Sequence, residues 1–354
     1  MALAFVDGFD HYNIADLDKK WTSIGSDAGC TSSMDTGRIS GQSLKQERVT
    51  NGQAEWMMKT YLASATQGAI GFAFKSTAYT YETSYKQRAD MSIAAIISGG
   101  ETNWFLVLGG DGSLSIYTRG GIYGFIFGGV LYLTCGSISL NTWHYIEWQW
   151  NFTTHTMLLH QDGVTIGSIT DASVAGTFNA VELLGAAPYG TGYHFNGTLW
   201  VDDVYALAGT TGQTALYGDV GIKVRLVENN GTTNQGVASA GDQHSCVDES
   251  LADVADYVTL DDVNEIETYQ VEDMPGDSEI KGIQVTALAK KTVDGAALVA
   301  SEIRHSGAEY THPTSQGLNT NFRFQMFPHE NDPSDTPWTP TTFNAAEFGV
   351  KKTG

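Results

Sequence analysis

The segment WHYIEWQWN (residues 143–151) decides the fold class of this 354-residue chain, because its side chains alternate with a period of two. Successive side chains of a β-strand point to opposite faces. One face carries His144, Ile146, Trp148 and Trp150, and the other carries Trp143, Tyr145, Glu147 and Gln149. Because the first set is mostly apolar, we expect Trp148 and Trp150 to lie between two sheets and Glu147 to face outward.

Strand patterns of the same kind extend in both directions from this segment. We predict further strands at residues 68–76, 91–98, 103–118, 155–169 and 197–207. The pairs Asp111-Gly112 and Asp162-Gly163 interrupt two of these runs, and this dipeptide is the strongest short signal for a hairpin. No stretch shows the apolar spacing of a long helix, so the chain is predicted to be all-β.

The second half of the chain predicts a separate, smaller sandwich. Alternating runs indicate strands at residues 216–227, 280–291, 297–305 and 320–328, with a last strand around 348–350. Residues 228–246 read as a long polar loop. We therefore expect a β-sandwich over 1–207, a linker over 208–214 and a smaller β-sandwich over 215–354.

Charge and cysteine usage restrict the partners of the chain. Nineteen basic and forty acidic residues give a net charge of −21, which repels phosphate backbones and anionic lipids, so neither nucleic acid nor a membrane is expected as a partner. Cys30, Cys135 and Cys246 lie far apart without a C-x-x-C pair and indicate free thiols of a reducing cytoplasm. The start MALAFVDGFDHY has no basic region before its apolar run, so no signal peptide is predicted.

Three motifs in the first half resemble one known fold. The W-H-x-I-E strand, the following strand that ends in DG, and the strand WVDDVY together resemble the concanavalin A-like, laminin-G-like jelly-roll sandwich over about residues 1–207. The resemblance implies that the first strand lies beside the last. We therefore expect FVDGFD (5–10) to pair next to LWVDDVYAL (199–207).

The second half resembles structural proteins of tailed bacteriophages. The segments that carry the resemblance are GDVGIKV (218–224), VDE (247–249), DYV (256–258), IKGIQVTALAKK (280–291) and the closing WTP with FNAAEFGVK (338–351). It implies a virion protein, made in the host cytoplasm, of the tail or its fibre and adaptor parts. Expected partners are other virion proteins, further copies of the chain and a host glycan. A capsid decoration protein and a free carbohydrate-binding module are the alternatives.

Residues for catalysis are not expected. Glycosidases on this sandwich resemble one another in carrying Glu-x-Asp-x-x-Glu on one strand, and residues 1–207 hold no such triplet. Glu147 is isolated, and the adjacent Asp202 and Asp203 are predicted to face opposite sides of a strand. Glu265 and Glu267 share a strand face but lie in an acidic region without basic or aromatic companions.

Two kinds of ligand site remain as candidates in the first half. A sugar needs an exposed aromatic ring and a few polar groups, although packed rings explain the same residues; the candidates are Trp104, Trp143, Tyr145, Tyr189 and Tyr193. Calcium prefers carboxylate oxygens, and pairing of the first and last strands would gather Asp7, Asp10, Asp202 and Asp203. No other cofactor is expected.

Two further segments point to contacts with other chains. Residues 120–136 contain no charged side chain, which fits either buried core or a subunit interface through Ile122, Tyr123, Phe125, Ile126 and Phe127. Residues 248–279 hold twelve acids and no lysine or arginine, a pattern typical of a solvated face that can also meet a basic patch on a neighbouring subunit.

Overall fold

The computed structural model describes residues 1–25, 30–48, 57–77, 91–98, 101–109, 111–118, 131–184, 197–210, 215–292 and 294–354. The chain divides into two compact units: the first is Met1–Phe9 with Trp21–Ile222, and the second is Asp10–Lys20 with Lys223–Gly354. Two bounds differ from the predicted ones. Residues 215–222 belong to the first unit, and residues 10–20 belong to the second.

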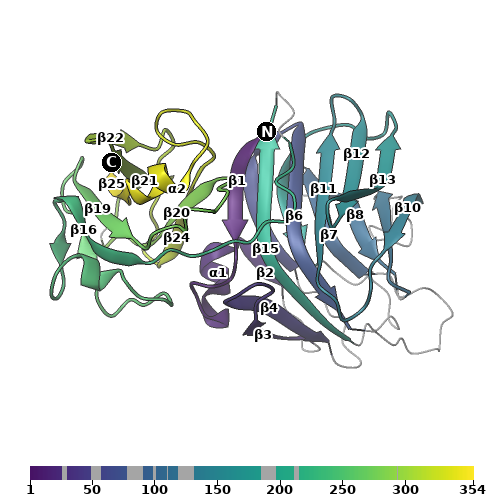
Figure 1. The fold of residues 1–354 in the computed structure, drawn as a ribbon, viewed down its shortest axis with the longest axis horizontal. Coiled ribbons are helices and arrows are strands. Elements are labelled where there is room, and N and C mark those ends of the chain that lie inside the picture. Colours follow the sequence, from purple (N-terminus) through teal and green to yellow (C-terminus); the bar gives the residue numbers. More distant parts are fainter. Residues whose placement is uncertain are drawn as a thin grey trace. The chain divides into compact units, whose positions relative to one another are not determined.

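The first unit is a sandwich of two antiparallel sheets, as the strand pattern predicted (Figure 1). Within the described chain, the larger sheet has eight strands in the order β13-β12-β11-β6-β15-β4-β3, with β1 also paired to β15. Its strands are β1 (Ala2–Asp7), β3 (Cys30–Thr36), β4 (Gln42–Arg48), β6 (Gln67–Ser76), β11 (His144–Asn151), β12 (Thr156–Gln161), β13 (Val164–Thr170) and β15 (Gly197–Gly209).

The second sheet of this unit has seven strands in its described part, in the order β10-β9-β8-β7-β14-β5-β2. They are β2 (Ser23–Gly25), β5 (Met57–Ala65), β7 (Met91–Ser98), β8 (Glu101–Leu108), β9 (Ser113–Thr118), β10 (Leu131–Ser137) and β14 (Phe178–Leu183). Trp148 and Trp150 are fully buried, as predicted, and the Trp150 ring meets Phe178 of the opposite sheet edge to face, with centroids 4.8 Å apart.

The predicted closure and hairpins of this sandwich are confirmed. Strand β1 pairs antiparallel with β15, which sets Asp7 opposite Val204. Both DG turns join adjacent strands, β8 to β9 and β12 to β13. In the second turn Asp162 and Gly163 both have positive φ, 51° and 77°, as a tight two-residue hairpin requires.

Cys30, Cys135 and Cys246 are free thiols, as expected from their spacing.

The second unit is also built of strands. Within its described residues a six-stranded sheet has the order β16-β19-β25-β21-β22, with β23 paired to β21, and two-stranded ribbons are formed by β17 with β18 and β20 with β24. The strands are β16 (Val227–Asn234), β17 (Val237–Ala238), β18 (Val258–Thr259), β19 (Ile266–Val271), β20 (Ile283–Ala289), β21 (Leu298–His305), β22 (Ala308–Thr311), β23 (Gln316–Gly317), β24 (Arg323–His329) and β25 (Glu347–Lys352).

The core of the second unit lies between the six-stranded sheet and the β20–β24 ribbon. Ile303, Trp338, Phe343 and Phe348 form a buried cluster against which Ile283 and Val285 of β20 pack. The chain is therefore all-β in both units, and β25 is the last strand that the sequence predicted. The helices α1 (Leu17–Lys20) and α2 (Pro340–Asn344) are single turns, and no helix of the described chain is long and apolar enough to span a membrane.

One strand of the second half was predicted in the wrong place. Residues 216–226 form no strand, and β16 starts only at Val227 and lies in the predicted polar loop. The reason is that β16 is an edge strand paired with β19, so its polar side chains can face solvent, while residues 215–222 pack on the first unit.

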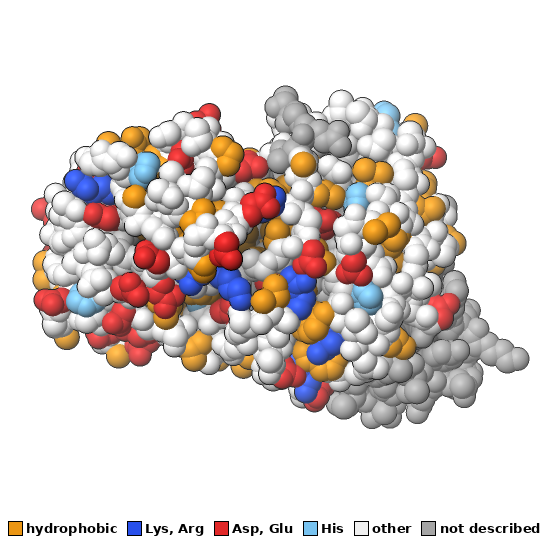
Figure 2. Space-filling model, in the orientation of Figure 1, with side chains coloured by type: hydrophobic (Ala, Val, Ile, Leu, Met, Phe, Trp, Pro, Cys, Tyr) orange, Lys and Arg blue, Asp and Glu red, His pale blue; other side chains and the backbone are white. Residues whose placement is uncertain are grey.

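Of the twelve acids in 248–279, seven are exposed, and Figure 2 shows red side chains gathered over loops of this unit.

Candidate functional site

Glu147 is buried, which corrects the expectation that it faces outward. Its side chain is only 2% exposed, and its Oε1 accepts hydrogen bonds from the Tyr205 hydroxyl and from the Gly218 amide, the latter at 2.8 Å. The Tyr205 ring lies over Gly71, where a Cβ atom would come within 2.1 Å of the ring. The outer face of β11 is thus covered by residues 215–222, with Leu216, Tyr217 and Val220 packed on it.

Burial also fixes the protonation state of Tyr205. Desolvation, and then the charge of Glu147, raise the pKa of Tyr205 well above its ordinary value. The phenol therefore stays a hydrogen-bond donor to Glu147 throughout the ordinary pH range. This pair holds the covering segment in place and offers no group poised for proton transfer.

A second cluster anchors the same segment through Arg38. The Arg38 backbone amide donates to Asp202 Oδ2 at 2.7 Å, and its Nε donates to Asp203 Oδ2 at 2.9 Å. Its two terminal nitrogens reach the Asp219 carboxylate at 2.5 Å and the Val220 carbonyl at 2.7 Å. Burial lowers the pKa of Arg38, but the carboxylates of Asp219 and Asp203 outweigh it and raise the pKa overall.

A bulge in β15 brings both aspartates to Arg38, which corrects the expectation that they face opposite sides. The register with β6 shifts between Asp202 and Tyr205, and Asp203 has a positive φ of 51°. The other oxygen of Asp203 accepts from the Ile222 amide at 2.6 Å. All these contacts are structural, because each carboxylate is engaged by donors of the chain itself.

The predicted calcium site is not formed. The Asp7 carboxylate is fully buried and accepts from the Phe9 amide at 2.9 Å and from Trp21 Nε1 at 2.7 Å. Asp10 belongs to the second unit, and Asp202 and Asp203 are held by Arg38. In the part of the chain that the structure describes, no group of three or more histidine, cysteine or acidic side chains is placed to hold a metal ion.

Two of the aromatic residues predicted to bind a sugar are buried, so the prediction is corrected for them. Trp104 is 3% exposed and packs edge to face on Tyr132, with centroids 5.0 Å apart. Tyr145 is fully buried, and its hydroxyl donates to the Asp203 carbonyl at 3.0 Å. Trp143 is half-buried, with Lys75 Nζ 4.8 Å from its ring centroid.

The other candidates lie outside the described residues. These are Tyr189 and Tyr193 for the sugar and Ile122, Tyr123, Phe125, Ile126 and Phe127 for the interface. Their roles stay predictions.

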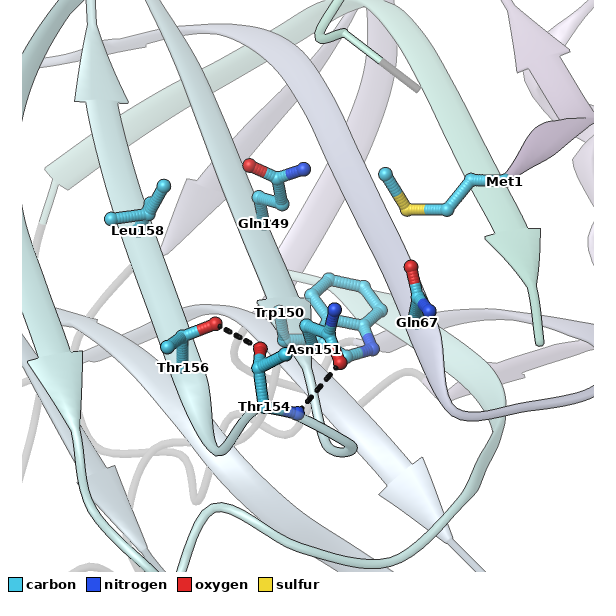
Figure 3. Close-up of a pocket in the computed structure, with 8 residues that line it drawn as sticks. All are labelled: Met1, Gln67, Gln149, Trp150, Asn151, Thr154, Thr156 and Leu158. Atoms are coloured by element: carbon cyan, nitrogen blue, oxygen red, sulfur yellow. Dashed lines mark hydrogen bonds between the residues drawn. The ribbon is translucent and has the colours of Figure 1, made fainter. Parts of the chain in front are cut away.

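The outer face of β11 also contains a small pocket, further along the strand than Glu147 (Figure 3). Its volume is about 70 Å³. Polar side chains line most of it, from Gln67, Gln149, Asn151, Thr154 and Thr156; Met1, Trp150 and Leu158 complete the wall. The strand register explains the grouping, because Gln149 lies opposite Leu158 and Asn151 lies opposite both Gln67 and Thr156.

Two glutamine amides of this pocket lack partners in the described protein. Gln67 and Gln149 are each only 8% exposed, and neither side chain makes a hydrogen bond to a described residue. Asn151 differs, because its Oδ1 accepts from the amides of Thr153 and Thr154 at 2.9 and 3.0 Å and leaves the amide nitrogen as a free donor. Both amides face the pocket with their hydrogen-bonding capacity unused by the described chain, so they identify the pocket as the candidate site.

Sequence reasoning placed Gln149 on the outward face of β11 but did not single it out. The signal that was available is a glutamine at a position whose neighbours on the same face, Tyr145 and Glu147, are also large and polar. Gln67 could not be joined to it from sequence, because that requires the register between β6 and β11.

Comparison with known proteins gives little beyond architecture. No protein-family model matches the chain, and no curated protein matches it. Among solved structures, a sialidase shares 12% identity with a TM-score of 0.43 and covers 58% of this chain, which spans 18% of the sialidase. The alginate lyase AlyC3 shares 10% identity, with a TM-score of 0.37 and coverage of 47% of this chain and 75% of the lyase.

A carbohydrate-binding module of a Ruminococcus gnavus sialidase, solved with sialyllactose, shares 17% identity. Its TM-score is 0.28, and the match covers 42% of this chain and 79% of the module. These neighbours include both enzymes and binding modules. At such identities and scores, none of them assigns an activity or a ligand to this chain.

Proposed function

We propose that the chain is a non-enzymatic structural protein of a tailed-phage virion, placed in the tail or its fibre and adaptor parts, where its first unit contacts host glycan. The virion assignment is supported by the sequence resemblance of the second half, carried by segments between residues 218 and 351. The glycan contact is supported by the polar pocket on the outer face of β11.

The non-enzymatic part of the proposal is supported by the hydrogen bonds of the carboxylates, which go to backbone amides of the chain. Glu147 and Asp203 hold residues 215–222 on the sandwich. In the second unit, Glu267 is buried and accepts from the Gly236 amide at 2.8 Å, and Glu265 accepts from the Asp262 amide at 2.9 Å. A pair of carboxylates that acts on a sugar needs free oxygens facing a shared cleft, and these four act as anchors of the backbone.

The test is the composition and structure of particles formed by the phage that encodes the chain. We expect peptides of the chain in purified particles at a fixed ratio to the other tail proteins, and density in cryo-electron microscopy that fits both units around the tail. Density over the capsid shell would identify a decoration protein instead. Absence from particles would overturn the proposal.

The pocket favours one second candidate, a free carbohydrate-binding module. A module of that kind binds glycan as a monomer and does not join particles. Sedimentation of the full chain and a glycan array, done on the same preparation, separate the two: glycan binding by a monomer that is absent from particles supports the module.

A further inference from the structure

Two glutamine side chains of the pocket make no hydrogen bond to a described residue, although each residue is only 8% exposed. Their amide atoms are not among the fully buried ones, so they reach the water of the pocket, which a ligand group can replace. The two amides, Gln67 and Gln149, face the same small space from adjacent strands (Figure 3). This arrangement is reasonable if a hydrogen-bonding group from outside the chain completes it.

The chemistry of the wall restricts that group. Among the described residues no acidic or basic side chain lines the pocket, so an ionic group would find no side chain of opposite charge there. The Asn151 nitrogen is fixed as a donor by the turn that holds its oxygen, whereas a glutamine amide can both donate and accept. A neutral group that itself both accepts and donates matches this set.

Size and the apolar part of the wall narrow the choice further. A volume of about 70 Å³ corresponds to about two water molecules, so a few heavy atoms enter and a sugar ring stays outside. Met1 and Leu158 add apolar surface to a wall that is otherwise polar. An acetamido group combines a carbonyl, an N–H and a methyl group within a few atoms. The side chains of asparagine and glutamine end in an amide without a methyl group, so they lack the apolar part that this wall would contact.

We propose that this pocket binds the acetamido group of an N-acetylated neutral sugar, with Gln149 and Gln67 as its hydrogen-bonding partners and Asn151 as a donor to its carbonyl. This inference names the ligand of the glycan contact and to that extent rests on the proposed function. A single small group held in this way gives weak binding, with a Kd on the order of millimolar. Repeated copies in an assembly would raise the avidity.

The test uses the full chain with its glutamine side chains labelled with ¹⁵N. Methyl N-acetylglucosaminide is titrated in, methyl glucoside serves as the sugar without the acetamido group, and free acetamide serves as the group without the sugar. We expect the amide resonances of Gln149 and Gln67 to shift with the first ligand and with acetamide, and acetamide to compete with the sugar.

Variants then assign the site. Gln149→Leu keeps a similar side-chain volume without the amide, and we expect it to weaken binding by tenfold or more. The matched control is Gln270→Leu at an exposed glutamine of the second unit, which should leave binding unchanged. Gln67→Leu is the second variant, should Gln149→Leu fail to fold, and is expected to weaken binding several-fold.

Three results would overturn the inference: equal binding of methyl glucoside, unshifted Gln149 and Gln67 resonances at saturating sugar, or tighter binding of a glutamine-containing peptide than of the sugar. Its failure is distinguishable from that of the proposed function. If the chain is present in particles but does not bind the acetamido group, only the ligand assignment is refuted. If the chain binds the group but is absent from particles, only the virion role is refuted.

Discussion

Replacement of Glu147 tests the conclusion that the carboxylates of the first unit serve the fold. In Glu147→Ala the Tyr205 hydroxyl and the Gly218 amide both lose their acceptor. Hydrogen bonds to a charged group contribute about 1.5–3 kcal/mol each, so two of them predict a loss of about 3–6 kcal/mol in the free energy of unfolding. Glu147→Gln keeps one acceptor oxygen and should lose about 1–2 kcal/mol.

The assay is urea unfolding followed by tryptophan fluorescence. Seven of the eight tryptophans lie before residue 223, so the signal reports chiefly on the first unit. The matched control is Glu47→Gln, because Glu47 is an exposed carboxylate of β4 whose ion pair with Lys45 lies at the surface. Surface pairs of this kind contribute little, so the control should change the free energy by less than about 0.5 kcal/mol.

Hydrogen exchange adds a local measurement that unfolding does not give. In both Glu147 variants the Gly218 amide should exchange faster, whereas the Ile222 amide, which Asp203 holds at 2.6 Å, should keep its protection. Unchanged exchange at Gly218, together with an unfolding free energy within about 0.5 kcal/mol of the parent, would refute the structural role and return Glu147 to the candidates for chemistry.

Three further predictions concern packing and charge. Gly71→Ala should cost about 2–3 kcal/mol, because its Cβ would lie 2.1 Å from the Tyr205 ring; a loss below about 0.5 kcal/mol in the same urea assay contradicts this. Glu302→Gln should stabilise the second unit at pH 8 by about 1 kcal/mol, because burial raises the pKa of Glu302 and its Oε1 is buried without a partner among the described residues; equal or lower thermal stability contradicts this. Burial, and then His312, lower the pKa of His329 from 6.5 to about 4. Between pH 6.5 and 4 the unfolded state therefore binds more protons than the folded state. The stability that is present above pH 6.5 is lost as the pH falls toward 4, by up to about 3 kcal/mol. In His329→Gln, the thermal stability measured between pH 7 and 4 should fall less steeply by this amount.

The elements that sequence reasoning predicted well depend on local chemistry. The alternation in 143–151 and the DG turns are decided within a few residues, and β11, β12 and β13 formed where they were expected. The pairing of β1 with β15 was predicted by the resemblance to the concanavalin A-like sandwich, since 197 residues or more separate its partners. Alternation alone gives no partner for a strand.

The errors arose where distant segments decide burial. Alternation placed Glu147 on the outward face, and that face is covered by residues 215–222, about seventy positions away and without regular structure. The same segment alternates in sequence and therefore resembled a strand, although its backbone amides bond to side chains such as Glu147 and Asp203. Asp202 and Asp203 share a partner only because β15 bulges there, which no residue pattern indicated.

The outer face of β11 is used in two different ways along its length. At Tyr145 and Glu147 the polar groups bond to other parts of the chain, and the covering segment closes over them. At Gln149 and Asn151, residues 215–222 are not among the described residues that line the pocket. The Gln149 amide makes no hydrogen bond to a described residue, and Asn151 keeps its amide nitrogen as a donor. Buried polar groups that stabilise a fold are satisfied by that fold, as the first pair is. The second pair keeps hydrogen-bonding capacity that the described chain does not use, which is typical of positions kept for binding rather than for folding.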